Sequence, residues 1–328
     1  MKSRPRPPAG QASPLGPGAE FDRIRAIAAV LGNQAPGLGD DCGFIKVGGE
    51  YLALSTDVSV DQVHFRFDWI DARAVGWRAA ASALSDLAAV GAEPLGLVAA
   101  VAMPASADQH ELLELMAGVG SAAEYAAAPV LGGDLSRSAV WSVAVTVLGR
   151  SRKPITRSGA EPGDRLWVTG TVGGARAALE SWQRGEQPPH ETFWRYAHPE
   201  PRIRAAQWLA RAGAHAMIDL SDGLASDAAH LAAASAVQLE IDLARLPVTP
   251  AVVHAAKRLN RSTGEFAAEG GEDYELLVAM PPAFDEADAF TQECGLELTR
   301  IGSVEKGNAA RFILHGKTIQ LTGYNHFG

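Results

Sequence analysis

The chain has 328 residues, about twice the size of a typical domain, so two domains are expected. Hydrophobic residues make up 47% and charged residues 20%, a globular balance that excludes a wholly disordered chain. Lys and Arg number 29 against 38 Asp and Glu, a formal charge of −9. A nucleic-acid-binding protein is therefore not expected, because phosphate backbones attract a basic surface.

Cysteine content and apolar run lengths indicate a cytoplasmic protein without a membrane partner. Cys42 and Cys294 are too few and too far apart for a zinc site or a disulfide framework. No uncharged apolar run approaches the roughly 18 residues of a membrane span. Residues 1–18 are rich in Pro and Gly and lack the apolar segment of a signal peptide, so they are predicted to be a disordered tail.

Residues 19–150 are predicted to form an N-terminal domain. A helix is expected near 20–31, because Phe21, Ile24 and Leu31 fall on one helical face and Gly32 follows them. Further along this half, Ala-rich segments predict helices and short apolar runs predict strands. The helices are expected at 72–90 and about 106–126, and the strands at 51–56, 95–103, 129–134 and 141–149.

The polar stretch 150–164 contains prolines and glycines and is the expected domain boundary, so 151–328 is predicted to be a C-terminal α/β domain. GEQPPHET is predicted to be a loop. Strands are expected at 165–170, 216–220, 237–243 and 274–280, helices at 173–184, 222–234, 249–260 and 285–294, and three short strands at the end. Strands and helices alternate irregularly in both halves, which predicts an α/β (α+β) fold rather than one long doubly wound sheet.

Several carboxylates stand where apolar elements end or inside apolar helices. Asp86 shares a helical face with Val75 and Val90, and Asp219 lies in the apolar run 216–220. Mg²⁺ takes carboxylate oxygens together with substrate phosphates, so such aspartates on rigid elements predict a polyphosphate site containing several Mg²⁺ ions. The other acidic positions of this kind are Asp40, Asp41, Asp57, Asp134, Asp222, Glu272 and Asp273.

Each acidic segment also has a simpler interpretation when it is taken alone. Asp86 could pair with an arginine such as Arg78, and Ser221 or Asp222 could cap the next helix. The Asp-Gly segments could be ordinary turns. The sequence contains no P-loop, protein-kinase motif set, G-x-S-x-G or H-E-x-x-H, which excludes those enzyme classes.

A set of segments, in the same order, resembles the thiamine-phosphate kinase family of the aminoimidazole-ribonucleotide-synthetase-like superfamily. The resemblance implies ATP-dependent phosphorylation of thiamine phosphate to thiamine diphosphate by in-line transfer, assisted by several Mg²⁺ ions. It also implies a two-domain protomer whose N-terminal domain forms the sheet or barrel of a homodimer. The segments are GLGDDCG (37–43), LSTDVSVDQVHF (54–65), ALSDLAAVGAEP (83–94), LGGDLSRS (131–138), TRSGAEPGDRLWVTGTVG (156–173), MIDLSDGLASDAAHL (217–231), GGEDYELL (270–277) and GYNHF (323–327).

The resemblance also implies roles for individual residues. Arg157 and Asp222 are expected to be catalytic. The expected Mg²⁺ ligands are Asp41, Ser55, Thr56, Asp57, Asp86, Asp134, Asp219 and Asp222. ATP is expected to contact Gly133, Asp134, Arg157 and Ser221, and the thiamine end is expected to contact His64, Glu272 and Tyr324.

The chain departs from the family pattern at a few positions. Gln62 stands where the family usually has Gly, and Asn325 where it usually has Asp; Leu135 and Ser136 replace a usual Thr pair. Another ATP-using synthetase or maturation protein of the same superfamily is the alternative. The segments GGEDYEL and GYNHF favour the thiamine branch.

Overall fold

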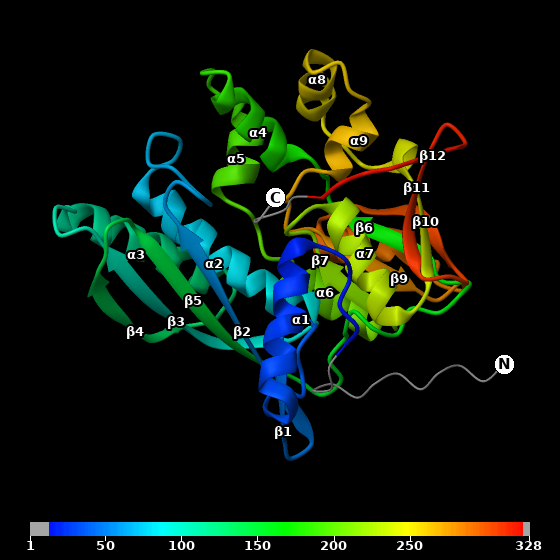
Figure 1. Cartoon of the computed structure of the whole chain (residues 1–328), viewed down its shortest axis with the longest axis horizontal. Coiled ribbons are helices and arrows are strands. Elements are labelled where there is room, and N and C mark those ends of the chain that lie inside the picture. Colours follow the sequence, from blue (N-terminus) through cyan, green and yellow to red (C-terminus); the bar gives the residue numbers. More distant parts are fainter. Residues whose placement is uncertain (1–12, 324–328) are drawn as a thin grey trace.

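The structure is a computed structural model that describes residues 13–323. Two sheets with their own helices form two halves, and both halves mix helices with strands (Figure 1), which confirms the predicted fold class. Of the expected tail, residues 1–12 lie outside the described residues. Residues 13–18 lie against the body of the chain, where the Ser13 N–H donates to the Leu38 carbonyl at 3.0 Å.

The N-terminal half is a five-stranded sheet in the order β1-β2-β5-β3-β4, antiparallel except for the β3–β4 pair. Val143, Val145 and Val147 on β5 are buried while the residues between them are partly exposed, so one face packs on a core and the other does not. The strands are β1 (Gly43–Val47), β2 (Glu50–Val60), β3 (Glu93–Met103), β4 (Val130–Arg137) and β5 (Ser142–Ser151); the helices are α1 (Ala19–Leu31), a 3-10 turn (Gly32–Gln34), α2 (Ala72–Ala89) and α3 (Gln109–Tyr125).

Helix α2 is almost entirely buried and crosses α3 closely. It begins where the Asp71 carboxylate accepts the Ala74 N–H at 2.8 Å. A Cβ on Gly76 would lie 1.8 Å from the Leu115 carbonyl oxygen, and one on Gly118 would lie 1.9 Å from that of Arg73. The backbones can therefore meet only because both positions lack a side chain.

The C-terminal half is a seven-stranded sheet in the order β12-β11-β8-β10-β6-β9-β7. The predicted loop GEQPPHET is wrong from His190 onward, where a helix begins. The strands are β6 (Arg165–Thr169), β7 (Ala216–Asp219), β8 (Gln238–Asp242), β9 (Leu276–Met280), β10 (Leu298–Glu305), β11 (Ala309–Leu314) and β12 (Lys317–Ile319); the helices are α4 (Gly174–Gln183), α5 (His190–Ala197), α6 (Ile203–Arg211), α7 (Leu224–Ser235), a 3-10 turn (Leu243–Arg245), α8 (Pro250–Arg258), α9 (Thr263–Ala268) and α10 (Ala287–Cys294).

The two halves share one of the two hydrophobic cores. Leu87 of α2 belongs to the same cluster as Trp182 of α4, Leu209 of α6 and Val278 of β9. A second cluster lies between α7–α9 and the other face of the C-terminal sheet. Helix α2 is thus held between the halves, so side chains at its C-terminal end face β7. Within residues 13–323, no helix is long and apolar enough to cross a membrane.

Candidate active site

Three carboxylates from distant segments meet between the two halves and form an acidic centre. Asp41 precedes β1, Asp86 lies near the end of α2, and Asp219 ends β7; one oxygen of each lies within 4.8 Å of the others. Asp41 and Asp219 are buried. Three like charges this close repel one another, and Mg²⁺ prefers carboxylate oxygens. The arrangement therefore suits a divalent cation.

Burial and mutual repulsion raise pKa values within the acidic centre. Burial, followed by the charge of Asp41, raises the pKa of Asp219 to about 7. Burial, followed by the charge of Asp219, raises the pKa of Asp86 well above its ordinary value. Ser85 Oγ donates to Asp219 Oδ2 at 2.5 Å and Ser55 Oγ to Asp86 Oδ2 at 2.6 Å, but neither bond neutralises the charge. A cation would do so, and the all-oxygen donor set fits Mg²⁺.

Arg157 contacts the acidic centre from the segment that joins the halves. Its Nη2 donates to Asp41 Oδ1 at 2.7 Å and its Nε to Asp41 Oδ2 at 3.2 Å. Its backbone N–H donates to Asp40 Oδ1 at 3.2 Å, and burial, followed by the charge of Asp41, raises the pKa of Asp40 to about 7. The expected catalytic arginine is therefore brought to the expected metal ligands.

The acidic centre opens into a cleft of about 750 Å³, which is within the usual range for small-molecule sites. The cleft brings together residues that the sequence assigned to metal, ATP and substrate. Ser55 reaches it through Asp86. The expected site residues that line it are Thr56, Asp57, His64, Asp86, Asp219, Ser221, Asp222 and Glu272. Tyr324 lies outside the described residues.

Two glycine-rich loops place Ser221, Asp222 and Glu272 side by side. The Glu272 N–H donates to the Ser221 carbonyl at 2.7 Å, and the Tyr274 N–H to that of Leu220 at 2.9 Å, which extends the β7–β9 pairing. Gly223, not Ser221 or Asp222, occupies the N-cap position of α7. Glu272 has φ 67° and Tyr274 φ 51°, left-handed values that cost free energy and cluster at functional sites.

The far end of the cleft is built around Tyr196. Its hydroxyl donates to the His64 carbonyl at 3.0 Å, and the Arg78 guanidinium lies 4.0 Å from its ring centroid. Arg78 is ion-paired with Glu272. The alternative in which Arg78 pairs with Asp86 is therefore wrong. The same contacts connect the two residues expected at the thiamine end: His64 accepts a hydrogen bond from Tyr196, Tyr196 packs against Arg78, and Arg78 pairs with Glu272.

Gly133 and Asp134 lie away from the acidic centre of the same chain. Asp134 on β4 pairs with Ala100, Ala100 with Ala144, and Ala144 with Val58 on β2. Three strand spacings, roughly 14 Å, therefore separate Asp134 from the strand of Asp57. All of β4 is exposed. One chain by itself does not bring these two residues to the cleft.

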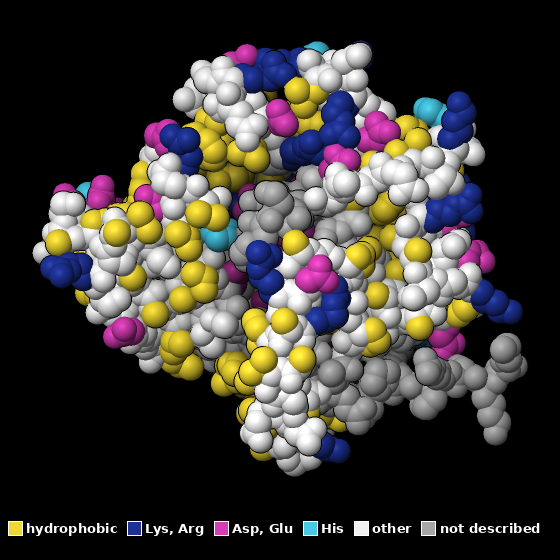
Figure 2. Space-filling view, viewed as in Figure 1, with side chains coloured by type: hydrophobic (Ala, Val, Ile, Leu, Met, Phe, Trp, Pro, Cys, Tyr) yellow, Lys and Arg dark blue, Asp and Glu magenta, His cyan; other side chains and the backbone are white. Residues whose placement is uncertain are grey.

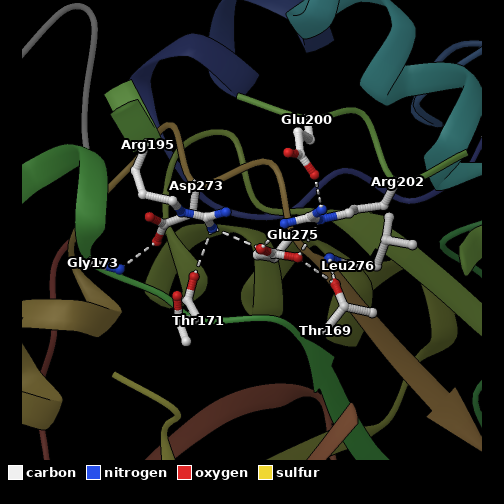
Figure 3. Close-up of polar contacts among 9 residues, drawn as sticks. All are labelled: Thr169, Thr171, Gly173, Arg195, Glu200, Arg202, Asp273, Glu275 and Leu276. Carbon is white, nitrogen blue, oxygen red and sulfur yellow. Dashed lines mark hydrogen bonds and ion pairs between the residues drawn. The ribbon is translucent and has the colours of Figure 1, made fainter. Parts of the chain in front are cut away.

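A buried ionic cluster around Glu275, the Glu275 cluster, lies next to the loops that carry Ser221 and Glu272 (Figure 3). Glu275 is fully buried and accepts from Arg202 at 2.6 and 2.8 Å, from Arg195 at 2.7 Å and from Thr169 at 2.7 Å. Its carbonyl accepts the Leu220 N–H at 2.8 Å. The cluster thereby ties α5 and the start of α6 to the end of β7, which carries Asp219, and to the loop before β9, which carries Glu272.

Sequence reasoning missed Tyr196 and Glu275, and it offered Arg78 only as a partner of Asp86, whereas Arg78 pairs with Glu272. Arg78 lies in the same Ala-rich helix as Asp86, and the argument that a charge on a buried helix needs a partner applies equally to it. Tyr196 lies on the unpredicted helix α5. The departure at Gln62 also acquires a physical meaning, since its φ is 65°, a conformation in which Gly carries no penalty.

Models of known families match most of the chain. Residues 39–151 match "AIR synthase related protein, N-terminal domain", and residues 161–315 match "AIR synthase related protein, C-terminal domain". A thiamine-monophosphate kinase of Aquifex aeolicus is 32% identical over 94% of this chain and 98% of that protein. One of Salmonella typhimurium is 34% identical over 94% of this chain and 95% of that protein.

Solved structures agree with these matches. "AaThiL complexed with AMPPCP and TMP" superposes with a TM-score of 0.83 at 32% identity, covering 94% of this chain and 97% of that one. The hydrogenase maturation protein HypE in complex with ATP, at 20% identity and a TM-score of 0.71, shares the fold alone. The matched domains and the relatives together show that the chain belongs to the thiamine-monophosphate kinase family, built from the two AIR synthase related domains.

Proposed function

We propose that this kinase transfers the γ-phosphoryl group of ATP to thiamine phosphate and so forms thiamine diphosphate. The observation that carries the proposal is that the acidic centre and the His64–Glu272 end open into one cleft. Family relatives named thiamine-monophosphate kinase, and a related structure holding AMPPCP and TMP, support it. No observation favours the alternative of a synthetase or maturation protein.

Asp41, Asp86 and Asp219 are the central Mg²⁺ ligands in this proposal, with Ser55, Thr56, Asp57 and Asp222 beside them. When bound, Mg²⁺ would neutralise the negative charge of the phosphates. The chain's own contribution is to hold these oxygens rigidly: Asp86 is on a buried helix and Asp219 at a strand end. This also explains how a chain of charge −9 accepts two anionic substrates.

Proton transfer requires no strong base in this reaction. The acceptor is a phosphate monoester whose second pKa is about 6, so it is already a dianion near neutral pH. Catalysis then depends on in-line positioning and charge neutralisation. Arg157 donates to Asp41 through Nε and Nη2, and we assign its Nη1 to the transferring phosphate. Ser221 is assigned to ATP, and Asp222 to the reacting phosphates.

We also propose that a second copy covers the open face of the N-terminal sheet. Ile45, Leu54, Val58 and Val98 on that face are 38–59% exposed, and Figure 2 shows apolar side chains gathered over this half and along α1. Asp134 is in register with this face. In a homodimer, Gly133 and Asp134 would contact ATP at the cleft of the other copy.

Activity and complementation test the two proposals. The purified protein should convert thiamine phosphate with ATP and Mg²⁺, and EDTA should stop the reaction; turnover of free thiamine in its place would contradict the assignment.

For the dimer proposal, Asp134→Asn and Asp86→Asn should each be inactive alone. If Asp134 acts across the dimer, mixing them restores activity, since one site of the mixed dimer is intact. No recovery would place Asp134 in its own subunit's site.

A further inference from the structure

Among residues 13–323, Trp69, in the loop between β2 and α2, is the aromatic side chain that the cleft leaves accessible. Among the Phe, Tyr and Trp residues that line the cleft within residues 13–323, Phe65, Tyr196 and Tyr274 are at most 8% exposed. Trp69 is only half-buried. Its exposed surface is therefore available to a ligand, whereas the other rings are enclosed by protein.

The indole of Trp69 is held firmly by side chains from the other half of the molecule. It stacks on Trp182 of α4 with ring centroids 5.2 Å apart and planes within 2°. The Tyr196 ring makes T-shaped contacts with both indoles, at centroid distances of 6.4 Å to Trp69 and 5.0 Å to Trp182. Such offset and edge-to-face contacts fix the orientation of a ring. The surface that faces the cleft is thus preorganised.

This indole already attracts a flat cation. The Arg66 guanidinium carbon lies 4.9 Å from its ring centroid. Arg66 pairs with Asp68 at 2.9 Å, but both side chains are largely exposed, at 42% and 58%. A cation–π contact of an exposed arginine contributes only about 0.5–1 kcal/mol, and Arg66 keeps its pairing with Asp68 when it moves away, so another cation can replace it at small cost.

The carboxylate expected at this end is not free to supply that attraction alone. Glu272 is ion-paired with Arg78, and Arg78 lies over Tyr196, the same residue that supports Trp69. An aromatic ring face also attracts a cation, and it does so without requiring an unpaired carboxylate in the protein. Trp69 and the acidic centre line the same cleft, so a ligand can place its ring on one and its phosphate near the other.

We propose that Trp69 determines substrate specificity: its indole face binds the flat cationic thiazolium ring of thiamine phosphate, while Trp182 and Tyr196 position it. The inference rests on the proposed function for the identity of the ligand. It predicts that the loss of the indole weakens binding of thiamine phosphate and leaves ATP unaffected, because the nucleotide is assigned to other residues.

Two substitutions separate the aromatic face from apolar bulk. Trp69→Leu keeps bulk without a π face, and Trp69→Phe keeps a smaller π face. Trp69→Leu should raise KM for thiamine phosphate about tenfold, within the range of a partly desolvated cation–π contact, with KM for ATP and kcat changed less than twofold. Trp69→Phe should stay within about threefold of wild type. The matched control is Trp194→Leu on α5, where Trp194 is 47% exposed and stacks on His190 and His198 instead.

Titration calorimetry without ATP gives a readout independent of turnover. Thiamine phosphate should bind Trp69→Leu about tenfold more weakly than wild type, and the thiazole monophosphate, whose ring carries no positive charge, should bind both equally. Equal affinity of wild type and Trp69→Leu for thiamine phosphate, or equal losses in the Leu and Phe variants, would overturn the inference. Wild-type protein that binds but does not phosphorylate thiamine phosphate would instead contradict the proposed function, and the titration would still decide the role of Trp69.

Discussion

Replacing Glu275 by Gln is expected to destabilise the folded chain by about 3–5 kcal/mol, the cost of removing one partner from a buried ion pair. Glu275 Oε1 accepts from Arg195 Nη2 and Arg202 Nη2, and Oε2 from Arg202 Nε and Thr169 Oγ1. Gln keeps the shape but turns an NH₂ group toward one of these pairs of donors. Arg202 is only 9% exposed, so water cannot replace the lost charge.

Glu200→Gln is the matched control, because it changes the other carboxylate that binds Arg202. Glu200 accepts from Arg202 Nη1 at 2.7 Å, but its side chain is 45% exposed. Its loss should therefore cost no more than about 1 kcal/mol. Urea denaturation followed by tryptophan fluorescence measures both: with an m-value of about 3 kcal/mol per M, Glu275→Gln should lower the midpoint by more than about 1 M.

The difference in stability between wild type and Glu275→Gln depends on pH in a defined direction. Burial opposes the charge on Glu275, but Arg202 and then Arg195 outweigh it and lower its pKa below the ordinary value. A carboxylate with a depressed folded pKa contributes stability above its unfolded pKa of about 4.3, and that contribution is lost as pH falls through the folded pKa. Wild type and Glu275→Gln should differ by a constant amount from pH 6 to 8 and converge below about pH 4. Equal, small losses for the two variants at pH 7 would refute the reasoning.

Further outcomes follow from the acidic centre and from the backbone at Gln62. Asp86→Asn and Asp219→Asn should abolish turnover yet leave the Mg²⁺-free melting temperature unchanged or higher, because a buried repulsion is removed; a large drop in Mg²⁺-free melting with normal turnover would indicate a structural ion pair instead. Gln62→Gly should retain activity and stability, whereas Gln62→Val should lose about 1 kcal/mol or more, because φ 65° is costly for a β-branched residue. Equal melting temperatures for these two variants would contradict the left-handed conformation.

The local sequence pattern was sufficient to predict most helices and strands. The apolar runs at 141–149 and 274–280 became β5 and β9, and the Ala-rich segment 72–90 became α2, because period and composition are properties of short segments. Helix α5 was missed because Pro188 and Pro189 indicate a loop, although Phe193, Tyr196 and Ala197 then follow at helical spacing. Strand β1 was missed because GFIKV lies between glycine-rich turns.

Sequence reasoning also identified the aspartates that are out of place, and the structure brings Asp41, Asp86 and Asp219 together. It could not choose partners, because an ion pair such as Arg78–Glu272 joins residues almost two hundred positions apart and depends on how α2 packs on the second half. The register of the N-terminal sheet likewise decided that Asp134 lies three strands from Asp57. Residue types and spacing therefore predicted that acidic side chains would gather at one site. Long-range packing alone decided which charges meet, because the burial that makes an unpaired charge costly exists only in the folded chain.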